Sequence, residues 1–204
     1  MKSIILASRS PRRQELLNQI GIKFRVETAD VEEEHGQGRA ARSICRRNAL
    51  AKAQVVAEQF PKQTVLGADT LVHLGDELLG KPASLTGARR MLRKLSGHTH
   101  HVTTACALVQ GTRKKVFSVT TRVRFQKLND RQINKYLRKV SVLDKAGAYA
   151  VQEKGEWLIE AIQGSLTNVV GLPLERLQSE LSAWFDTASS RIYTARANAS
   201  TCLR

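Results

Sequence analysis

Two adjacent arginines stand where a helix is expected to begin, which is a place that favours bound anions. Arg12 and Arg13 directly follow Ser10 and Pro11; serine is a common N-cap residue and proline fits the first helical position. A helix N-terminus carries partial positive charge, so cations there are unfavourable unless an anion compensates them. Free backbone N–H groups, serine hydroxyls and two guanidinium groups therefore predict a phosphate-binding site. The alternative is two solvated arginines near the start of a helix.

A single carboxylate, Asp69, interrupts an otherwise apolar stretch. Residues 64–72 carry apolar side chains in both alternating rows, which predicts a buried central strand. A carboxylate there costs free energy unless it is paired, binds a metal or opens onto a site. Gly67 and Ala68 beside it leave room for a ligand. The pattern predicts a functional carboxylate, either a general base or a metal ligand, and leaves those two roles open.

Lys52 and a short acidic cluster are further candidates. Lys52 falls within the apolar stripe of the helix expected over residues 40–59, so it is either a snorkelling lysine or an ammonium group directed into a cleft. Glu32, Glu33 and Glu34 lie in the glycine-containing stretch 30–38, which predicts a loop. Such a cluster is either a solvated turn or a surface that faces a metal or substrate.

Alternating strands and helices are expected to position these residues. Strands are predicted at 4–7, 24–28, 64–72, 100–110, 116–125 and 156–162, and a hairpin through Gly75-Asp76 is predicted to contain a short strand before Lys81. Helices are predicted at 11–20, 40–59, 85–95, 130–139 (with Asp130 as its N-cap) and 174–185. The segment 164–173 is predicted to be a loop that can close on a ligand. Residues 186–204 lack apolar periodicity and are predicted to be a disordered tail. No repeat or linker is visible, so the domain is predicted to span residues 1–185.

The amino-acid composition limits the classes of molecule that this protein is expected to bind. The chain has 33 basic and 18 acidic residues, a net charge of +15, which suits nucleic acid or a small polyphosphate. Aromatic residues make up 5%, too few to suggest a base-stacking platform. Three cysteines without a CxxC pair predict a reducing, cytoplasmic setting, and no apolar run is long enough for a membrane span. His98, His100 and His101 lack an evident third ligand and are expected to be structural or surface residues.

Six motifs in order resemble the Maf-like nucleoside triphosphate pyrophosphatases, over about residues 3–185. The chain contains Ala7-Ser8-x-Ser10-Pro11-Arg12-Arg13-x-Glu15-Leu16-Leu17, Lys52-Ala53, Gly67-Ala68-Asp69-Thr70 with Gly80-Lys81-Pro82, Leu95-Ser96-Gly97-x-x-His100-x-Val102-x-Thr104, Asp144-Lys145-Ala146-Gly147-Ala148-Tyr149, and Gly164-Ser165 with Asn168-Val169-Val170-Gly171-Leu172-Pro173.

The resemblance implies an α/β fold in which a twisted mixed sheet, flanked by helices, surrounds a substrate cleft, as in the related ITPase-like proteins. It implies hydrolysis of a nucleoside triphosphate between the α- and β-phosphates, assisted by a divalent cation such as Mg²⁺ or Mn²⁺, in an enzyme that is often a homodimer. It implies no membrane and no specific nucleic-acid partner. The implied roles are proton acceptor for Asp69, phosphate binding for Ser8, Arg12, Arg13, Lys52 and Lys81, and metal binding for Glu33 and Asp69.

The block 144–149 followed by Gln152 resembles the branch of the family that acts on dTTP and UTP. The family's specificity positions correspond to Arg12, Thr70 and Gln152, and a regular strand would point Thr70 away from Asp69. The chain departs from the family pattern at residues 141–143 and at Glu153, which bears on the preferred base. The alternatives are a pyrophosphatase for modified nucleotides or 7-methyl-GTP and a non-enzymatic nucleic-acid-binding protein, which would gain nothing from an interior carboxylate.

Overall fold

The computed structural model describes residues 3–28, 30–34 and 41–199, with side chains described as far as Asp186. The chain divides into two units, one ending at Pro173 and one beginning at Leu174. Residues 35–38, the second half of the predicted acidic loop, lie outside the described part, as do the terminal residues 200–204. No helix among the described residues is both long and apolar enough to cross a membrane.

The first unit is built on a mixed sheet, which confirms the predicted fold class. In the described chain it has seven strands in the order β2-β1-β3-β5-β6-β7, with β4 paired to β3. The strands are β1 Ile4–Ala7, β2 Phe24–Val26, β3 Val65–Leu74, β4 Glu77–Leu79, β5 Thr99–Gln110, β6 Arg113–Phe125 and β7 Ile159–Gln163. β1 runs parallel to β2 and β3, and the other pairs are antiparallel.

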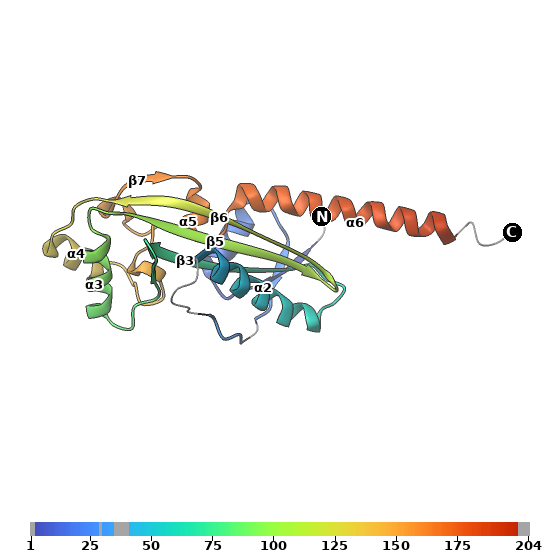
Figure 1. Cartoon of the computed structure of the whole chain (residues 1–204), viewed down its shortest axis with the longest axis horizontal. Coiled ribbons are helices and arrows are strands. Elements are labelled where there is room, and N and C mark those ends of the chain that lie inside the picture. Colours follow the sequence, from blue (N-terminus) through green and yellow to red (C-terminus); the bar gives the residue numbers. More distant parts are fainter. Residues whose placement is uncertain (1–2, 29, 35–40, 200–204) are drawn as a thin grey trace. The chain divides into compact units, whose positions relative to one another are not determined.

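Helices flank this sheet (Figure 1). They are α1 Pro11–Gln19, α2 Ala41–Gln59, α3 Leu85–Leu95, α4 Asp130–Leu137 and the short α5 Leu166–Val170, with 3-10 turns at Ala146–Ala148 and Gly155–Trp157. Serine at position 10 and proline at 11 begin α1 as predicted, and Leu16 and Leu17 form its buried face. The second unit contains α6, Leu174–Ala199.

Gly67 lets α2 lie directly on β3. A Cβ atom at this position would lie 2.3 Å from the carbonyl oxygen of Ala49 and 2.8 Å from the backbone nitrogen of Ala53. Both alanines are completely buried, so small side chains face each other across the contact. This close approach is what allows side chains of α2 to reach Asp69, which lies two residues further along β3 on the same face as Gly67.

Several predicted boundaries differ from the structure. Asn129, not Asp130, caps α4: its side chain accepts from the Gln132 backbone and Gln132 reaches back to the Asn129 N–H, which is a capping box. Asp130 instead pairs with Arg93. The strand β7 begins three residues later than predicted, because the segment before it forms a 3-10 turn after Lys154, whose backbone is left-handed.

Two segments predicted without regular structure contain helix. Within the predicted loop 164–173, Ser165 accepts from the Asn168 N–H and caps α5, an arrangement typical of serine. The final helix does not end at Phe185 but continues through Ala199, and alanine, which recurs in this segment, has the highest helix propensity. The division into a domain over 1–185 and a tail over 186–204 stays a prediction.

Candidate functional site

One open cavity of about 590 Å³ lies in the first unit. It is formed by the turn from β1 to α1, the acidic loop, α2, β3, Lys81 two residues after β4, Val102 of β5, the segment 144–152 and the end of α5. Every site residue predicted from the sequence lines it: Ser8, Arg12, Arg13, Glu33, Lys52, Asp69, Thr70, Lys81 and Gln152. The structure thus brings these residues together, while their individual roles stay predictions.

Asp69 is held from α2 by two donors. It is only 4% exposed. Its Oδ1 accepts from Lys52 Nζ at 2.7 Å, and its Oδ2 accepts from Asn48 Nδ2 at 3.1 Å. Lys52 Nζ also lies 2.7 Å from Glu33 Oε1. The ammonium group therefore points into the cavity, between two carboxylates, and does not extend along the helix surface into solvent.

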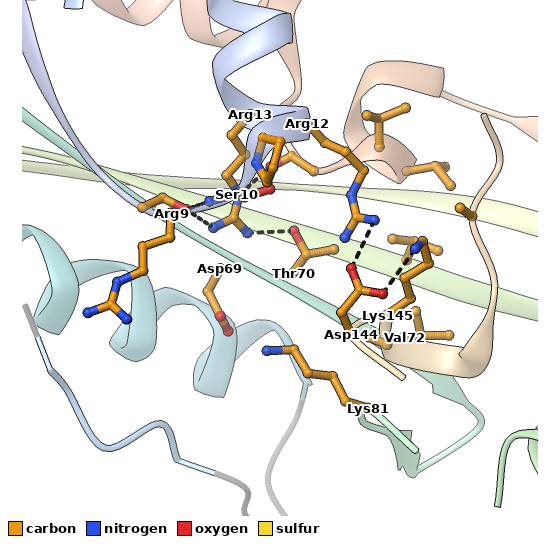
Figure 2. Close-up of a pocket in the computed structure, with 18 of the residues that line it drawn as sticks. Arg9, Ser10, Arg12, Arg13, Asp69, Thr70, Val72, Lys81, Asp144 and Lys145 are labelled. Atoms are coloured by element: carbon orange, nitrogen blue, oxygen red, sulfur yellow. Dashed lines mark hydrogen bonds and ion pairs between the residues drawn. The ribbon is translucent and has the colours of Figure 1, made fainter. Parts of the chain in front are cut away.

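Arg13 ties together three separate parts of the cavity wall. Its Nε donates to the Gly171 carbonyl at 3.1 Å, and its Nη1 donates to the Ala68 carbonyl at 2.9 Å and to Ser8 Oγ at 3.1 Å. Its Nη2 donates to Thr70 Oγ1 at 3.1 Å, as Figure 2 shows. A guanidinium has five N–H donors, and Arg13 makes four hydrogen bonds to acceptors of the protein itself. Arg13 thus orders the walls around a ligand in addition to any contact with one.

The hydroxyl of Thr70 has a fixed role in this network. Thr104 Oγ1 donates its hydrogen to the Asn168 carbonyl at 2.9 Å, so in the 2.9 Å contact between the two threonine hydroxyls Thr70 must be the donor. Thr70 meanwhile accepts from Arg13. The hydroxyl hydrogen of Thr70 is therefore directed into the protein. Thr70 contacts Arg13 whereas Asp69 contacts α2, so the two side chains point to opposite faces of β3, as predicted from the alternation of a regular strand.

The other arginine of α1, Arg12, pairs with the segment 144–152. Arg12 Nη1 lies 3.7 Å from Asp144 Oδ2, and Figure 2 shows the two side chains pointing toward each other. Lys145, which is buried, donates to Asp144 Oδ1 at 3.0 Å. Burial disfavours ionisation of Asp144, but the hydrogen bond and charge of Lys145, with the charge of Arg12, outweigh it and lower the pKa of this carboxyl.

The departures from the family pattern meet at Lys145. Its ammonium donates to the Ser141 carbonyl and lies 3.3 Å from Glu153 Oε1. Of the altered residues, Glu153 therefore contributes a side-chain partner next to Gln152, whereas position 141 contributes only its backbone carbonyl. Gln152 and Lys81 are both exposed at the cavity, and Lys81 points toward Asp69 in Figure 2, so both are available to a ligand.

Behind this segment, His100 supports Tyr149 from the core. His100 is completely buried, and its Nε2 lies 2.8 Å from the Tyr149 hydroxyl. Burial, together with the charges of His101 and His73, lowers the pKa of His100 to about 4. The residue is therefore neutral near pH 7, and its complete burial agrees with the structural or surface role predicted for it.

This pKa predicts a loss of stability in mild acid. The unfolded chain binds a proton on His100 below the ordinary pKa of 6.5, whereas the folded chain does so only below about 4. Stability is thus lost as the pH falls from 6.5 to 4, and His100 alone should lower the free energy of unfolding by about 3 kcal/mol over that range. Urea unfolding at pH 7 and pH 4.5 measures it. His100→Gln should flatten the dependence, whereas His98→Gln, at an exposed position, should not. Equal slopes for wild type and His100→Gln would contradict the assignment.

Comparison with known proteins decides the family. A model described as Maf-like protein matches residues 3–184. This chain belongs to the Maf family. The dTTP/UTP pyrophosphatase of Akkermansia muciniphila is 47% identical over 171 residues, which cover 84% of this chain and 90% of that protein. The Myxococcus xanthus dTTP/UTP pyrophosphatase is 48% identical, with 84% and 87% covered. The Staphylococcus aureus Ham1 protein shares the fold, with a TM-score of 0.52 and 18% identity over 89% of this chain and 99% of that chain.

The Maf resemblance implied a divalent cation, and the residues at the cavity suit one. Asp69 and Glu33 supply the hard oxygen ligands that Mg²⁺ and Mn²⁺ prefer, and Lys52 Nζ holds one oxygen of each at 2.7 Å. Among the described residues no group of three or more His, Cys, Asp or Glu side chains could hold a metal. Mg²⁺ is commonly bound by one or two carboxylates with substrate phosphates and water, so this donor set fits a cation that binds together with a nucleotide.

Sequence reasoning did not assign roles to three residues of the Maf site. Asn48 lies in the apolar stripe of the helix predicted over residues 40–59, and an amide inside such a stripe is a signal for a buried polar contact. Asp144 and Lys145 were recognised only as part of a motif. Asp144 pairs with Arg12 and Lys145 pairs with Asp144, next to a turn whose backbone, with Gly147 at φ 73° and Ala148 at φ 62°, has no strong signature in the sequence.

Proposed function

We propose that this Maf chain hydrolyses dTTP and UTP to the nucleoside monophosphate and pyrophosphate. The observation that carries the proposal is the buried carboxylate of Asp69, held by Lys52 and Asn48 at a cavity lined by cationic side chains. The two relatives named dTTP/UTP pyrophosphatases are similar over most of the chain, which supports the choice of substrate.

The residues divide between phosphate binding and proton transfer. Arg12, Lys81 and the N-terminal N–H groups of α1, beside Ser8, bind the triphosphate, since these are charged or polar donors at the cavity. Asp69 accepts the proton of the attacking water as the bond between the α- and β-phosphates breaks and pyrophosphate leaves. Mg²⁺ or Mn²⁺, held by Asp69 and Glu33, would neutralise the charge that develops on the phosphates.

Within this site, Lys52 mainly offsets the negative charge of the two carboxylates that it contacts. Its ammonium contacts both Asp69 and Glu33, which leaves one of its three hydrogens for a phosphate oxygen. Lys52 thus holds the proton acceptor and the second carboxylate in one arrangement while contributing positive charge to phosphate binding.

Recognition of the base is assigned to the exposed amide of Gln152, with Arg12 in the same cavity and Thr70 acting through Arg13. An amide offers a donor and an acceptor, which suits the O4 and N3–H edge shared by uracil and thymine. A site built on such hydrogen bonds rejects a base that would leave them unpaired. The C5 methyl group is a small apolar difference, so kcat/KM for dTTP and UTP should agree within about 10–200-fold.

A substrate panel tests this proposal. Pyrophosphate release from dTTP, UTP, 7-methyl-GTP, ATP and GTP should be measured with magnesium, manganese and cobalt. The expected result is highest kcat/KM for dTTP and UTP, and loss of that preference in Gln152→Ala. A highest value for 7-methyl-GTP would overturn the substrate assignment. Salt-dependent duplex binding without any pyrophosphate release would favour the nucleic-acid-binding alternative.

We also propose a cytoplasmic location, since Cys45 and Cys106 are free thiols in the described structure and free thiols are typical of reducing compartments. A homodimeric state and the lack of a specific nucleic-acid partner stay predictions.

A further inference from the structure

We propose that Asn48 is a positioning residue that fixes the carboxylate of Asp69 against the acidic loop, residues 30–34. Its side chain contacts both parts of the site at once. Nδ2 donates to Asp69 Oδ2 at 3.1 Å, and the same amide forms two hydrogen bonds with the backbone of Glu34. This inference rests on the proposed pyrophosphatase activity.

The contact with the loop fixes which way the Asn48 amide points. The backbone N–H of Glu34 lies 2.9 Å from Oδ1 of Asn48, and because an N–H group can only donate, this atom must be the oxygen. Nδ2 is then the atom that faces Asp69, and its other hydrogen points to the Glu34 carbonyl at 3.3 Å. Both donors of the amide are therefore used, one on the loop and one on the carboxylate.

This arrangement sets the direction of the Asp69 carboxylate. Lys52 occupies one oxygen and Asn48 the other, so rotation of the carboxylate about its last bond would break one of these hydrogen bonds. An ionised carboxylate has about four lone-pair sites, and two of them remain to accept a proton from water or to bind a cation. Asn48 thus directs the remaining lone pairs without occupying them.

Asn48 is well placed to hold this geometry because it is buried, so water cannot compete for its hydrogen bonds. It is only 2% exposed, on a helix that Gly67 allows to lie against β3. A displaced carboxylate is costly for catalysis, since an error of about 1 Å in a reacting group can reduce the rate 100-fold.

Arg47 provides a matched control on the same helix. It donates to both carboxylate oxygens of Glu34, with Nε–Oε1 and Nη2–Oε2 distances of 2.8 Å. It therefore also anchors the acidic loop, but no hydrogen bond links it to Asp69. Comparing the two positions separates anchoring of the loop from orientation of the carboxylate.

The experiment measures kcat and KM for dTTP in wild type, Asn48→Asp, Asn48→Ser and Arg47→Gln, with thermal melts of each. Asn48→Asp keeps the acceptor for the Glu34 N–H but replaces the donor that faces Asp69. We expect kcat to fall about 100-fold in both Asn48 variants, with KM changed less than about threefold. Arg47→Gln should keep kcat within about threefold of wild type.

The possible results distinguish a positioning role of Asn48 from a purely structural one. If either Asn48 variant is folded and keeps kcat within about threefold of wild type, or if Arg47→Gln loses as much kcat as they do, Asn48 does not position Asp69. If Asn48→Asp does not fold, Asn48→Ser decides; if neither folds, the role of Asn48 is structural and the inference is wrong. Wild type that fails to release pyrophosphate would instead overturn the proposed function.

Discussion

Asp69→Asn is expected to lower kcat for dTTP by at least about 100-fold, since removal of a general base typically costs 10²–10⁴ in rate. The variant should fold, but with a lower Tm. An asparagine amide that accepts from Lys52 would turn its own NH₂ group toward the Nδ2 donor of Asn48, and a buried donor without an acceptor costs about 1–3 kcal/mol.

Binding should survive in this variant, because the phosphate donors are untouched. Steady-state kinetics and calorimetric binding of a non-hydrolysable dTTP analogue provide the measurement. Asp144→Asn is the matched control: it removes a carboxylate from the same cavity, but one that pairs with Arg12, and it should retain most of kcat. Turnover by Asp69→Asn within about threefold of wild type would exclude this residue as the proton acceptor.

Arg13→Ala should lower both stability and activity, in contrast to Arg12→Ala. Arg13 donates four hydrogen bonds that join the β1–α1 turn, β3 and the residue after α5. Hydrogen bonds from a charged group contribute roughly 1.5–3 kcal/mol each and are not additive, so a total loss of a few kcal/mol is expected. Since about 1 kcal/mol corresponds to 2–4 °C in a chain of this size, the Tm should fall by at least about 5 °C.

Differential scanning calorimetry and kinetics with dTTP measure the two effects of Arg13→Ala. We expect kcat/KM to fall about 100-fold, because the walls that hold the phosphates lose their shared anchor. Arg13→Lys should recover little, since an ammonium cannot reproduce the planar fork. Arg12→Ala should weaken substrate binding with little change in Tm, because Arg12 makes a single 3.7 Å ion pair with Asp144. An unchanged Tm in Arg13→Ala would show that its hydrogen bonds do not join the cavity walls.

Some residues of the cavity could be predicted from the sequence because they violate a local rule, whereas Thr70, Lys81 and Gln152 were expected there only from the resemblance to the Maf family. Asp69 is a carboxylate in an apolar strand, Arg12 and Arg13 are cations at a helix start, and Lys52 lies inside an apolar stripe. These violations are local, so a single sequence exposes them. The strand and helix order follows from the same periodicity, and most elements begin and end within a few residues of the prediction.

The partners of these residues could not be predicted, because they depend on distances between elements that are far apart in sequence. Arg13 was expected to be a phosphate ligand, yet its donors reach the carbonyl of Gly171, 158 residues away. Lys52 was expected to face phosphate, yet it lies between Glu33 and Asp69. The short helix α5 was missed because it depends on the Ser165 cap more than on apolar periodicity.

We propose above that the cavity around Asp69 cleaves a pyrimidine nucleoside triphosphate between the α- and β-phosphates. Phosphorus NMR of the products formed from dTTP and Mg²⁺ by the wild-type protein, with Asp69→Asn run in parallel, tests it most directly. We expect dTMP and pyrophosphate in equal amounts, no inorganic phosphate, and almost no product with the variant. Formation of dTDP and inorganic phosphate, or equal turnover by wild type and variant, would contradict it.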